Sequence, residues 1–234
     1  MFWKDDVLHY AQCPLCGGRA FRAGPNKRMN QGLAPCCLGC FSLERHRIIN
    51  ACYRALPPAM LRACSCLHFA PDRAVEPGWF ASYEASTYGG ENSLDLEAID
   101  RPDDTYDWII CNHVLEHLPD DVQGMREMLR VAKPEGVVQF AIPSPLYRKQ
   151  TEDWGGPDNR QHGHWRIYGE DFMDRFVGVL TPENVLSVTA IDPVTGARDV
   201  LFFTSRSPGT LQALRRWFTA TPKEEGDVAT RTGG

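Results

Sequence analysis

The chain has 234 residues, of which 43% are hydrophobic and 24% charged, and its formal net charge is −5. This composition excludes a disordered or fibrous protein, and the length suits one α/β domain with a small additional module. No apolar run approaches the length of a membrane span, and the first residues lack a signal-peptide pattern. We therefore expect a cytoplasmic protein with no membrane partner.

Charge is distributed unevenly along the chain. Residues 1–62 hold nine Lys and Arg against three Asp and Glu, whereas the remainder holds sixteen against twenty-seven. A basic segment of this kind either meets nucleic acid or an acidic substrate, or packs on the acidic remainder of its own chain. An excess of six positive charges is modest. We favour packing and leave a nucleic-acid partner and an oligomer open.

Two C-x2-C pairs, separated by twenty residues, stand out in the region 1–42. Four thiolates at this spacing predict a closed, tetrahedral and therefore structural zinc site, and the region is interpreted as a zinc ribbon. The alternative is a set of free or disulfide-bonded thiols. Cys36 stands beside the second pair and is an alternative to Cys37, although it breaks the two-residue spacing. The predicted metal ligands are Cys13, Cys16, Cys37 and Cys40.

Residues 43–60 are predicted to form a linking helix. Ser42 is placed to cap it, Arg45 stands where a capping box would have Glu, and Pro57 and Pro58 end it. The stretch 42–47 reads SLERHR. Its Arg and His residues form either a solvated helix face or a connection between the cysteine module and the mouth of an active site, and the sequence leaves both interpretations open.

The main domain is expected at 61–206 and begins with a strand over 62–69. The loop that follows, 68–72, contains no glycine, although Ala70 is small and Pro71 suits the first position of a helix. A second strand is predicted within 79–87, with Glu84 as its nearby carboxylate. The step Ser93-Leu94-Asp95-Leu96 precedes the next strand.

A strand–helix–strand unit lies at the centre of the sequence. Residues 106–111 form a short apolar run typical of a strand buried on both faces. Residues 120–133 carry apolar side chains at helical spacing, and 133–136, with Pro134 and Gly136, are expected to end that helix. Residues 137–142 predict the next strand. Such units build parallel sheets with ligands at the carboxyl ends of the strands.

The region beyond is different. Residues 143–168 are polar and rich in Gly and Pro, with no strand or helix period but many aromatic and ionisable side chains, and we interpret them as a lid loop over a substrate. A helix over 169–180 and strands over 185–191 and 199–204 follow, the strands forming an antiparallel edge. Residues 207–234 are predicted to hold a terminal helix and a disordered tail.

The sequence resembles the class I methyltransferases that depend on S-adenosylmethionine (SAM). The matching residues are Asp107, the HVLEH motif of 113–117, the segment 130–134 and Gly136, with Glu135 where a glycine is usual. The motifs SLERHR and HFAPD resemble a bacterial subfamily with an N-terminal zinc ribbon. This resemblance implies a Rossmann-like α/β fold, with a mostly parallel sheet, an antiparallel edge strand and the small zinc ribbon.

The resemblance also implies a cofactor site. Asp72 is expected to accept hydrogen bonds from the SAM ammonium group, Glu84 from the ribose hydroxyls and Asp95 from the adenine amino group, although subfamily register puts Thr87 at the ribose position. Asn112 and His113 are expected to line the donor sulfur. The full cofactor-binding set is His68, Phe69, Ala70, Pro71, Asp72, Glu84, Asp95, Leu96, Asn112 and His113.

The predicted function is transfer of a methyl group from SAM to a hydroxyl or amine of a small metabolite or saccharide. His164 or His162 is expected to act as general base, because a neutral imidazole takes up a proton near pH 7, and His113 completes the catalytic set. Glu116 and His117 are interpreted as loop and helix-start groups. The alternatives are another SAM-dependent reaction, such as a lyase or a different fragment transfer, and an inactive scaffold that binds a partner.

Overall fold

The structure is a computed structural model that describes residues 11–143 and 145–219. The first ten residues and the predicted tail beyond 219 lie outside the described residues. Nothing in the described ranges forms a helix of the length and apolar character needed to cross a bilayer.

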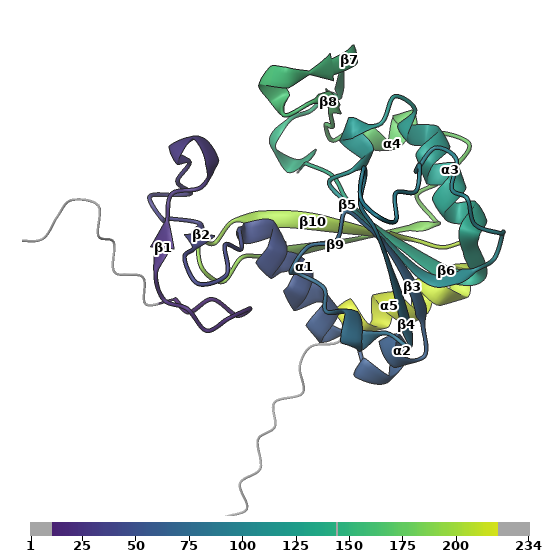
Figure 1. Ribbon diagram of the computed structural model, residues 1–234, viewed down its shortest axis with the longest axis horizontal. Helices are drawn as coiled ribbons and strands as arrows, with labels where there is room; N and C mark the ends of the chain where they lie inside the picture. Colours follow the sequence, from purple (N-terminus) through teal and green to yellow (C-terminus); the bar gives the residue numbers. More distant parts are fainter. Residues whose placement is uncertain (1–10, 144, 220–234) are drawn as a thin grey trace, which may run out of the picture.

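A six-stranded sheet with the order β4-β3-β5-β6-β10-β9 forms the centre of the molecule (Figure 1). The first four strands are parallel, whereas β10 runs antiparallel to both β6 and β9. This confirms the predicted fold class, a mostly parallel sheet with an antiparallel edge. The strands are β3 Ser65–Phe69, β4 Ser82–Ser86, β5 Tyr106–Asn112, β6 Ala132–Ala141, β9 Val185–Ile191 and β10 Arg198–Thr204.

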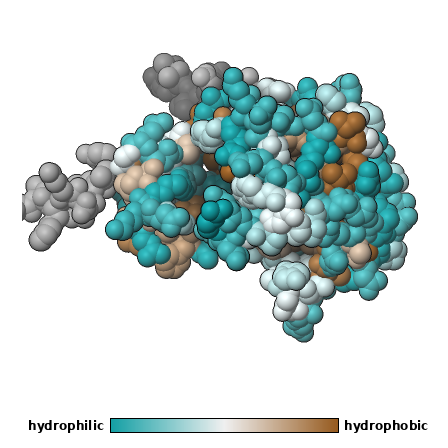
Figure 2. All heavy atoms as spheres, turned by 90° about the horizontal axis from the view of Figure 1, so that it is seen from above, coloured by the Kyte–Doolittle hydropathy of each residue, from teal (hydrophilic) through white to brown (hydrophobic). Residues whose placement is uncertain are grey.

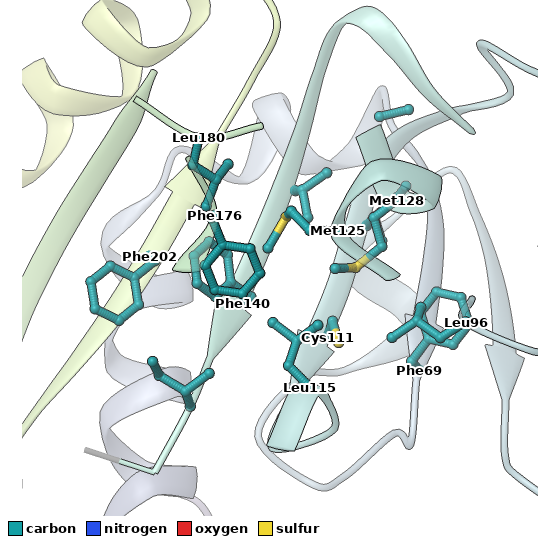
Figure 3. Close-up of a cluster of buried hydrophobic side chains, with 14 of the residues drawn as sticks. Phe69, Leu96, Cys111, Leu115, Met125, Met128, Phe140, Phe176, Leu180 and Phe202 are labelled. Atoms are coloured by element: carbon teal, nitrogen blue, oxygen red, sulfur yellow. The ribbon is translucent and has the colours of Figure 1, made fainter. Parts of the chain in front are cut away.

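Helices cover both faces of the sheet (Figure 1). The first face packs against α3 (Asp121–Val131) and α4 (Phe172–Arg175), whose side chains join the cluster shown in Figure 3. The second packs against α1 Glu44–Ala55, α2 Pro58–Arg62 and α5 Pro208–Thr219. Alternate residues of β5 enter the two clusters, with Ile109 on one face and Ile110 on the other, so this strand is buried on both sides as predicted.

The helix α3 begins and ends close to its sequence signals. Asp120 caps its first turn by accepting a hydrogen bond from the Gln123 amide at 2.9 Å. At the other end the helix stops at Val131, just before the predicted 133–136, and these four residues form an irregular insertion near the start of β6 rather than a free turn. Gly136 lies in an irregular start of the strand, where an added Cβ would approach the Tyr106 carbonyl oxygen to 2.9 Å. An added Cβ would also approach the Lys133 backbone nitrogen to 2.9 Å, so glycine is required here because the chain folds closely on itself.

The linking helix is also different from the prediction. It is divided into α1 and α2, and its N-cap is Leu43 rather than Ser42. The Leu43 amide donates to Nδ1 of His46 at 2.9 Å, so His46 performs the capping role expected of a residue at Arg45. The Ser42 hydroxyl instead lies 3.3 Å from the sulfur of Cys13.

The stretch 143–168 is not an irregular loop. It contains a hairpin of two antiparallel strands, β7 (Glu152–Asp158) and β8 (His164–Ile167), which projects beyond the carboxyl end of β5 (Figure 1). The helix predicted over 169–180 is reduced to the four residues of α4. Short 3-10 turns complete the described elements: Pro25–Lys27, Pro77–Trp79, Leu115–His117, Pro145–Tyr147 and Asn159–Gln161.

The cysteine module packs on the turn between β9 and β10. Its two short strands, β1 (Phe21–Arg22) and β2 (Cys36–Cys37), are antiparallel. Arg47 of α1 joins the module to the main sheet: its guanidinium donates to both carboxylate oxygens of Asp192, at 2.6 and 2.9 Å, and to the Pro35 carbonyl. Both charged side chains are fully buried, so the interpretation of SLERHR as a solvated face is wrong for Arg47.

The surface seen in Figure 2 is mostly hydrophilic, with apolar side chains gathered in a few small, separate patches. Most of the apolar side chains of the chain are instead used in the two layers beside the sheet. The face in this view therefore offers no single large apolar area for a partner.

Candidate functional site

A cavity of about 760 Å³ lies at the carboxyl ends of β3, β4 and β5. This is the edge at which open parallel sheets bind their ligands. Its walls come from five places along the chain: the ends of the three strands, the segment 93–97 and the β7–β8 hairpin. The lining residues are Phe69, Ala70, Ser86, Tyr88, Ser93, Leu94, Asp95, Leu96, Glu97, His113, Val114, His117, Leu118, Pro119, Pro157, Gly163 and Trp165.

Ala70 adopts a left-handed backbone conformation of the kind that a glycine would provide, although the loop 68–72 contains no glycine. Its φ is +47°, in the left-handed region that glycine adopts most readily. Its amide donates to the Ser86 carbonyl at 2.8 Å, which joins the ends of β3 and β4 beneath the cavity. The backbone can therefore turn away at this point and leave room for a ligand, as a glycine-containing loop would. This geometry and the cavity's size fit a nucleoside cofactor.

Five predicted cofactor residues line this cavity. They are Phe69, Ala70, Asp95, Leu96 and His113. Phe69 and Leu96 are almost fully buried and offer an apolar wall, whereas Asp95 is exposed at the rim and accepts a hydrogen bond from the Glu97 amide at 2.9 Å.

The other predicted cofactor residues lie away from the cavity wall. His68 is buried in the sheet with Nδ1 2.8 Å from the Tyr83 hydroxyl, and burial lowers its pKa to about 3. The amide oxygen of Asn112 accepts from Gln139 at 2.8 Å, beneath the sheet tip. Both residues point into the core because side chains alternate along a strand.

The two remaining carboxylates are engaged locally. One oxygen of Asp72 accepts from the Ala74 amide at 2.7 Å, and Pro71 beside it is also outside the cavity lining. Glu84 accepts from Arg101 and from the Tyr106 hydroxyl, both at 2.5 Å. Burial opposes ionisation of Glu84, but these hydrogen bonds lower its pKa.

Twelve lining residues were not among the predicted site residues, and they include Ser86, Tyr88, His117 and Trp165. Tyr88 follows β4 and is 97% exposed, so an aromatic face is available at the rim. A tyrosine placed directly after the predicted second strand was the available signal for it. His117 belongs to the HVLEH motif and lines the cavity, so its interpretation as only a loop residue was incomplete.

A group of imidazoles and one carboxylate lies at the hairpin side of the cavity. The rings of His117 and His164 meet edge to face with 4.6 Å between centroids, and the ring of His162 is 6.2 Å from that of His164. Nδ1 of His113 is 3.4 Å from a carboxylate oxygen of Glu116. We refer to these five residues as the histidine group. The structure therefore brings together all three predicted catalytic histidines.

Arg166 fixes the hairpin to the loop after β5. It is 1% exposed, and its guanidinium donates to the Leu118 carbonyl at 2.6 Å, to the Pro119 carbonyl at 2.9 Å and to Asp153 at 2.9 Å. Because Arg166 and His164 are on the same strand, these bonds hold His164 against the HVLEH loop.

Two properties of the histidine group bear on its chemistry. Burial lowers the pKa of His164 from its ordinary value, which keeps the imidazole neutral near pH 7. His113 has a φ of +56°, an uncommon conformation for a residue with a side chain. Neutral imidazoles act as proton acceptors or as metal ligands.

The four predicted metal-binding cysteines converge. The sulfurs of Cys13, Cys16, Cys37 and Cys40 all lie within 4.8 Å of one another. Sulfurs around a tetrahedral zinc, with bonds of about 2.3 Å, are about 3.8 Å apart. The observed distances of 3.7 Å (Cys13 to Cys40) and 3.5 Å (Cys16 to Cys37) are close to this. The four side chains therefore fit a closed metal site.

The surroundings of the cysteines favour Cys37 over Cys36 and a thiolate at Cys40. Cys36 is buried outside the group of four. Burial raises the pKa of the Cys40 thiol, but hydrogen bonds to the Ser42 side chain and backbone outweigh this and lower the pKa to about 7. Thiolates are the form that binds metal.

A second cavity, of about 400 Å³, lies between the cysteine module and the sheet and shares His113 with the first. Most of its lining residues carry polar or charged side chains and come from the module, α1 and the β9–β10 hairpin. The lining residues are Arg28, Met29, Asn30, Leu43, Glu44, Arg45, His113, Tyr147, Ala197, Arg198 and Asp199.

Comparisons with known proteins assign the main domain. The family model described as a methyltransferase domain matches residues 59–177, slightly more than half of the chain. A ubiquinone/menaquinone biosynthesis C-methyltransferase from Geobacter sulfurreducens is 37% identical over 71 residues, which cover 27% of this chain and 28% of that protein. The aligned part thus spans little more than a quarter of this curated relative.

Solved structures of similar shape include two methyltransferases. A SAM-dependent methyltransferase from Thermotoga maritima has a TM-score of 0.46 at 11% identity, covering 70% of this chain and 91% of that one. The 1,6-didemethyltoxoflavin-N1-methyltransferase of Burkholderia thailandensis, with S-adenosylhomocysteine bound, has a TM-score of 0.44 at 14% identity, covering 66% and 77%. The match of the family model over 59–177, on the sheet and cavity described above, shows that this chain belongs to the class I SAM-dependent methyltransferase family.

Proposed function

We propose that the protein transfers a methyl group from SAM to a hydroxyl or amine of a small, polar acceptor such as a metabolite or saccharide. The observation that carries this proposal is the 760 Å³ cavity at the strand ends, which shares His113 with the polar 400 Å³ cavity. One cavity suits the cofactor and the other the acceptor.

The lining of the larger cavity suits SAM. Phe69 and Leu96 provide apolar surface for the adenine, Asp95 offers a carboxylate at the rim, and Ala70 leaves the backbone open to close approach. When bound, SAM supplies an activated methyl group, so the protein mainly has to orient the acceptor and accept its proton.

The histidine group is placed to do both. His113 lines both cavities, and its shared position suits a residue that contacts the acceptor next to the donor methyl. His164, kept neutral by burial, or His162 beside it, would accept the proton from a hydroxyl or ammonium as the new bond forms. The β7–β8 hairpin contributes Gly163 and Trp165 to the cavity wall and would exclude water there.

The acceptor cavity supports a polar acceptor. Its wall carries the guanidinium groups of Arg45 and Arg198 together with the Tyr147 side chain and the carboxylate of Asp199. Such walls bind hydroxyl, carboxylate or phosphate groups better than apolar ones. The cysteine module supplies one side of this cavity, which suggests that it shapes the acceptor site.

We also infer that the four cysteines bind a structural zinc ion and that the chain belongs to the zinc-ribbon subfamily suggested by its motifs. The convergence of the four sulfurs at distances that suit a tetrahedral zinc supports this. None of the nine cysteines forms a disulfide, which agrees with the reducing, cytoplasmic location that we propose.

Equilibrium titration with SAM and S-adenosylhomocysteine tests the cofactor site. We expect stoichiometric binding by the wild type and at least tenfold weaker binding by Ser93→Trp, which would fill the cavity wall. Ser187→Trp places the same side chain on the exposed face of β9, outside the cavity lining, and should bind as the wild type does. Equal affinity of the two variants would contradict the assignment.

Product analysis tests the reaction itself. Methyl transfer releases S-adenosylhomocysteine in a one-to-one ratio with the methylated acceptor, whereas a lyase or another fragment transfer releases a different nucleoside. A panel of hydroxylated and amino acceptors, with S-adenosylhomocysteine as the common readout, would identify the acceptor class. Methylation would be refuted if the protein binds SAM and converts it only to nucleosides other than S-adenosylhomocysteine, with no acceptor methylated.

A further inference from the structure

The histidine group contains an unusual carboxylate. Glu116 is 1% exposed, and its Oε1 lies 3.4 Å from His113 Nδ1. Its other oxygen, Oε2, is buried and has no hydrogen-bond partner among the residues that the structure describes. An ionised carboxylate left in this way costs several kcal/mol. Apart from His113, whose imidazole is positive only when protonated, no described residue forms an ion pair with this carboxylate, so Oε2 is left available to a positively charged ligand.

Two histidines close to Glu116 are candidates for further ligands. One oxygen of Glu116, one ring nitrogen of His117 and one of His164 all lie within 4.8 Å of one another. Metal–ligand bonds of about 2.0–2.2 Å place neighbouring ligand atoms roughly 3–3.5 Å apart. Side-chain movements of about 1 Å would bring these three atoms to bonding distance of a single ion. His117 is exposed, so an ion can enter from the cavity.

We propose that Glu116, His117 and His164 form a binding site for a divalent first-row transition-metal ion at the base of the cavity. Two imidazoles and one carboxylate are a donor set used by catalytic zinc and by non-haem iron(II), and they leave coordination positions open. The site is separate from the four cysteines, whose soft thiolates form a closed set without an open position.

The protein holds these ligands rigidly, as a metal site needs. Glu116 and His117 belong to the 3-10 turn Leu115–His117, and Arg166 fixes that turn to the strand bearing His164 through its bonds to Leu115, at 3.3 Å, and Leu118. Oε1 of Glu116 faces His113, which resembles the hydrogen-bonded outer partners that orient metal ligands elsewhere and leaves Oε2 for the ion.

In this arrangement the ion can bind the acceptor. That role depends on the methyl transfer proposed above, whereas the proposal that the site binds a metal does not depend on it. An acceptor hydroxyl on an open coordination position would have a lowered pKa. His113, with Nδ1 toward Glu116, has its other ring nitrogen buried and without a partner among the described residues, and would accept the hydroxyl proton. His164 would then act as a ligand, and the proton would pass to His113 instead.

Binding of Mn²⁺ by the full-length, zinc-loaded protein tests the site. Mn²⁺ is a useful probe because it prefers oxygen and imidazole ligands and leaves thiolates to zinc. Electron paramagnetic resonance titration of the free ion should show one bound Mn²⁺ per chain. Glu116→Gln and His164→Gln should weaken binding at least tenfold, whereas His162→Gln, which changes a neighbouring imidazole outside the three ligands, should bind as the wild type does.

Thermal unfolding separates a ligand from a merely structural residue. With zinc retained and no other divalent ion added, Glu116→Gln should unfold at the same or a higher temperature than the wild type, because the buried charge is removed. Added Mn²⁺ should raise the unfolding temperature of the wild type only, as expected for an ion bound by the native state.

The proposal is overturned if the wild type binds no Mn²⁺ beyond its zinc, or if the ligand variants bind it as the wild type does. If the protein, with zinc retained, still binds SAM and methylates an acceptor in the presence of a chelator, the ion has no role at the acceptor. That result would leave the methyltransferase assignment intact. Conversely, one bound Mn²⁺ with no methyl transfer would refute only the proposed function.

Discussion

Replacing Arg47 with leucine tests how the cysteine module is joined to the main domain. The Arg47 guanidinium and the Asp192 carboxylate are both fully buried and make two hydrogen bonds, at 2.6 and 2.9 Å. Burial opposes ionisation of Asp192, yet the bonds from Arg47 and Thr195 lower its pKa. Removing Arg47 leaves this charge without its cation, which typically destabilises a protein by about 3–5 kcal/mol.

That loss is a large part of the ~5–15 kcal/mol by which proteins are stable. For a chain of this size each kcal/mol corresponds to about 2–4 °C, so the unfolding temperature should fall by roughly 6–20 °C. Differential scanning calorimetry and urea unfolding measure the change. Arg54→Leu is the matched control on the same helix, because its ion pair with Glu76 is more than half exposed and is worth at most about 1 kcal/mol.

A double variant completes the test. If the buried charge is the cause, Arg47→Leu combined with Asp192→Asn should recover part of the lost stability, since the unpaired carboxylate is then absent. The reasoning is refuted if Arg47→Leu unfolds within 2 °C of the wild type, or if the double variant is as unstable as the sum of the single ones.

Three further predictions concern the metal, the cofactor loop and the pH dependence. Cys37→Ser should lose the single zinc atom per chain in elemental analysis, whereas Cys36→Ser should retain it; zinc loss in both would contradict the assignment of Cys37. Ala70→Gly should raise the free energy of unfolding by about 1 kcal/mol, because the φ of +47° is strained for alanine, and an equally large fall would show that the strain is absent. His68 has a folded-state pKa of about 3, lowered by burial, against about 6.5 unfolded; the unfolded state therefore binds more protons between these values, and stability falls as the pH drops below 6.5. His68→Leu should lose about 2 kcal/mol less than the wild type between pH 6.5 and 4.5 in urea unfolding, and identical pH profiles would exclude this origin.

The elements that could be predicted from the sequence are those whose signals are local. The unit from Tyr106 to Ala141 was recognisable because a buried strand, a capped amphipathic helix and a second apolar run follow one another. The spacing of the cysteine pairs was likewise sufficient to predict that they converge. In both cases the determining residues are neighbours along the chain.

The β7–β8 hairpin could not be predicted in this way. Its strands are polar, contain Gly155 and Gly156, and have an irregular register between Asp153 and Asp158. What holds it is tertiary: Arg166 binds the loop after β5, some fifty residues earlier in the chain. The contact leaves no hydrophobic periodicity within the segment, so the sequence predicted a loop there.

The candidate site shows the same limit at the level of single side chains. The loop 68–72 was correctly located, but the sequence does not tell which residues at a strand's end face the ligand and which face the core. Phe69 lines the cavity, whereas His68 points into the sheet and Asn112 bonds to Gln139. The absence of glycine was misleading for a similar reason, because Ala70 adopts a glycine-like φ.

The anchoring of Arg47 has a practical consequence for shortening the protein. The guanidinium also donates to the backbone carbonyls of Pro35 and Ser42, which belong to the cysteine-rich segment. Cutting the chain before α1 would therefore remove acceptors from the interior of the catalytic half. The described part of the cysteine module, residues 11–43, cannot be trimmed away like a fused tag, and a minimal version of the enzyme should retain it.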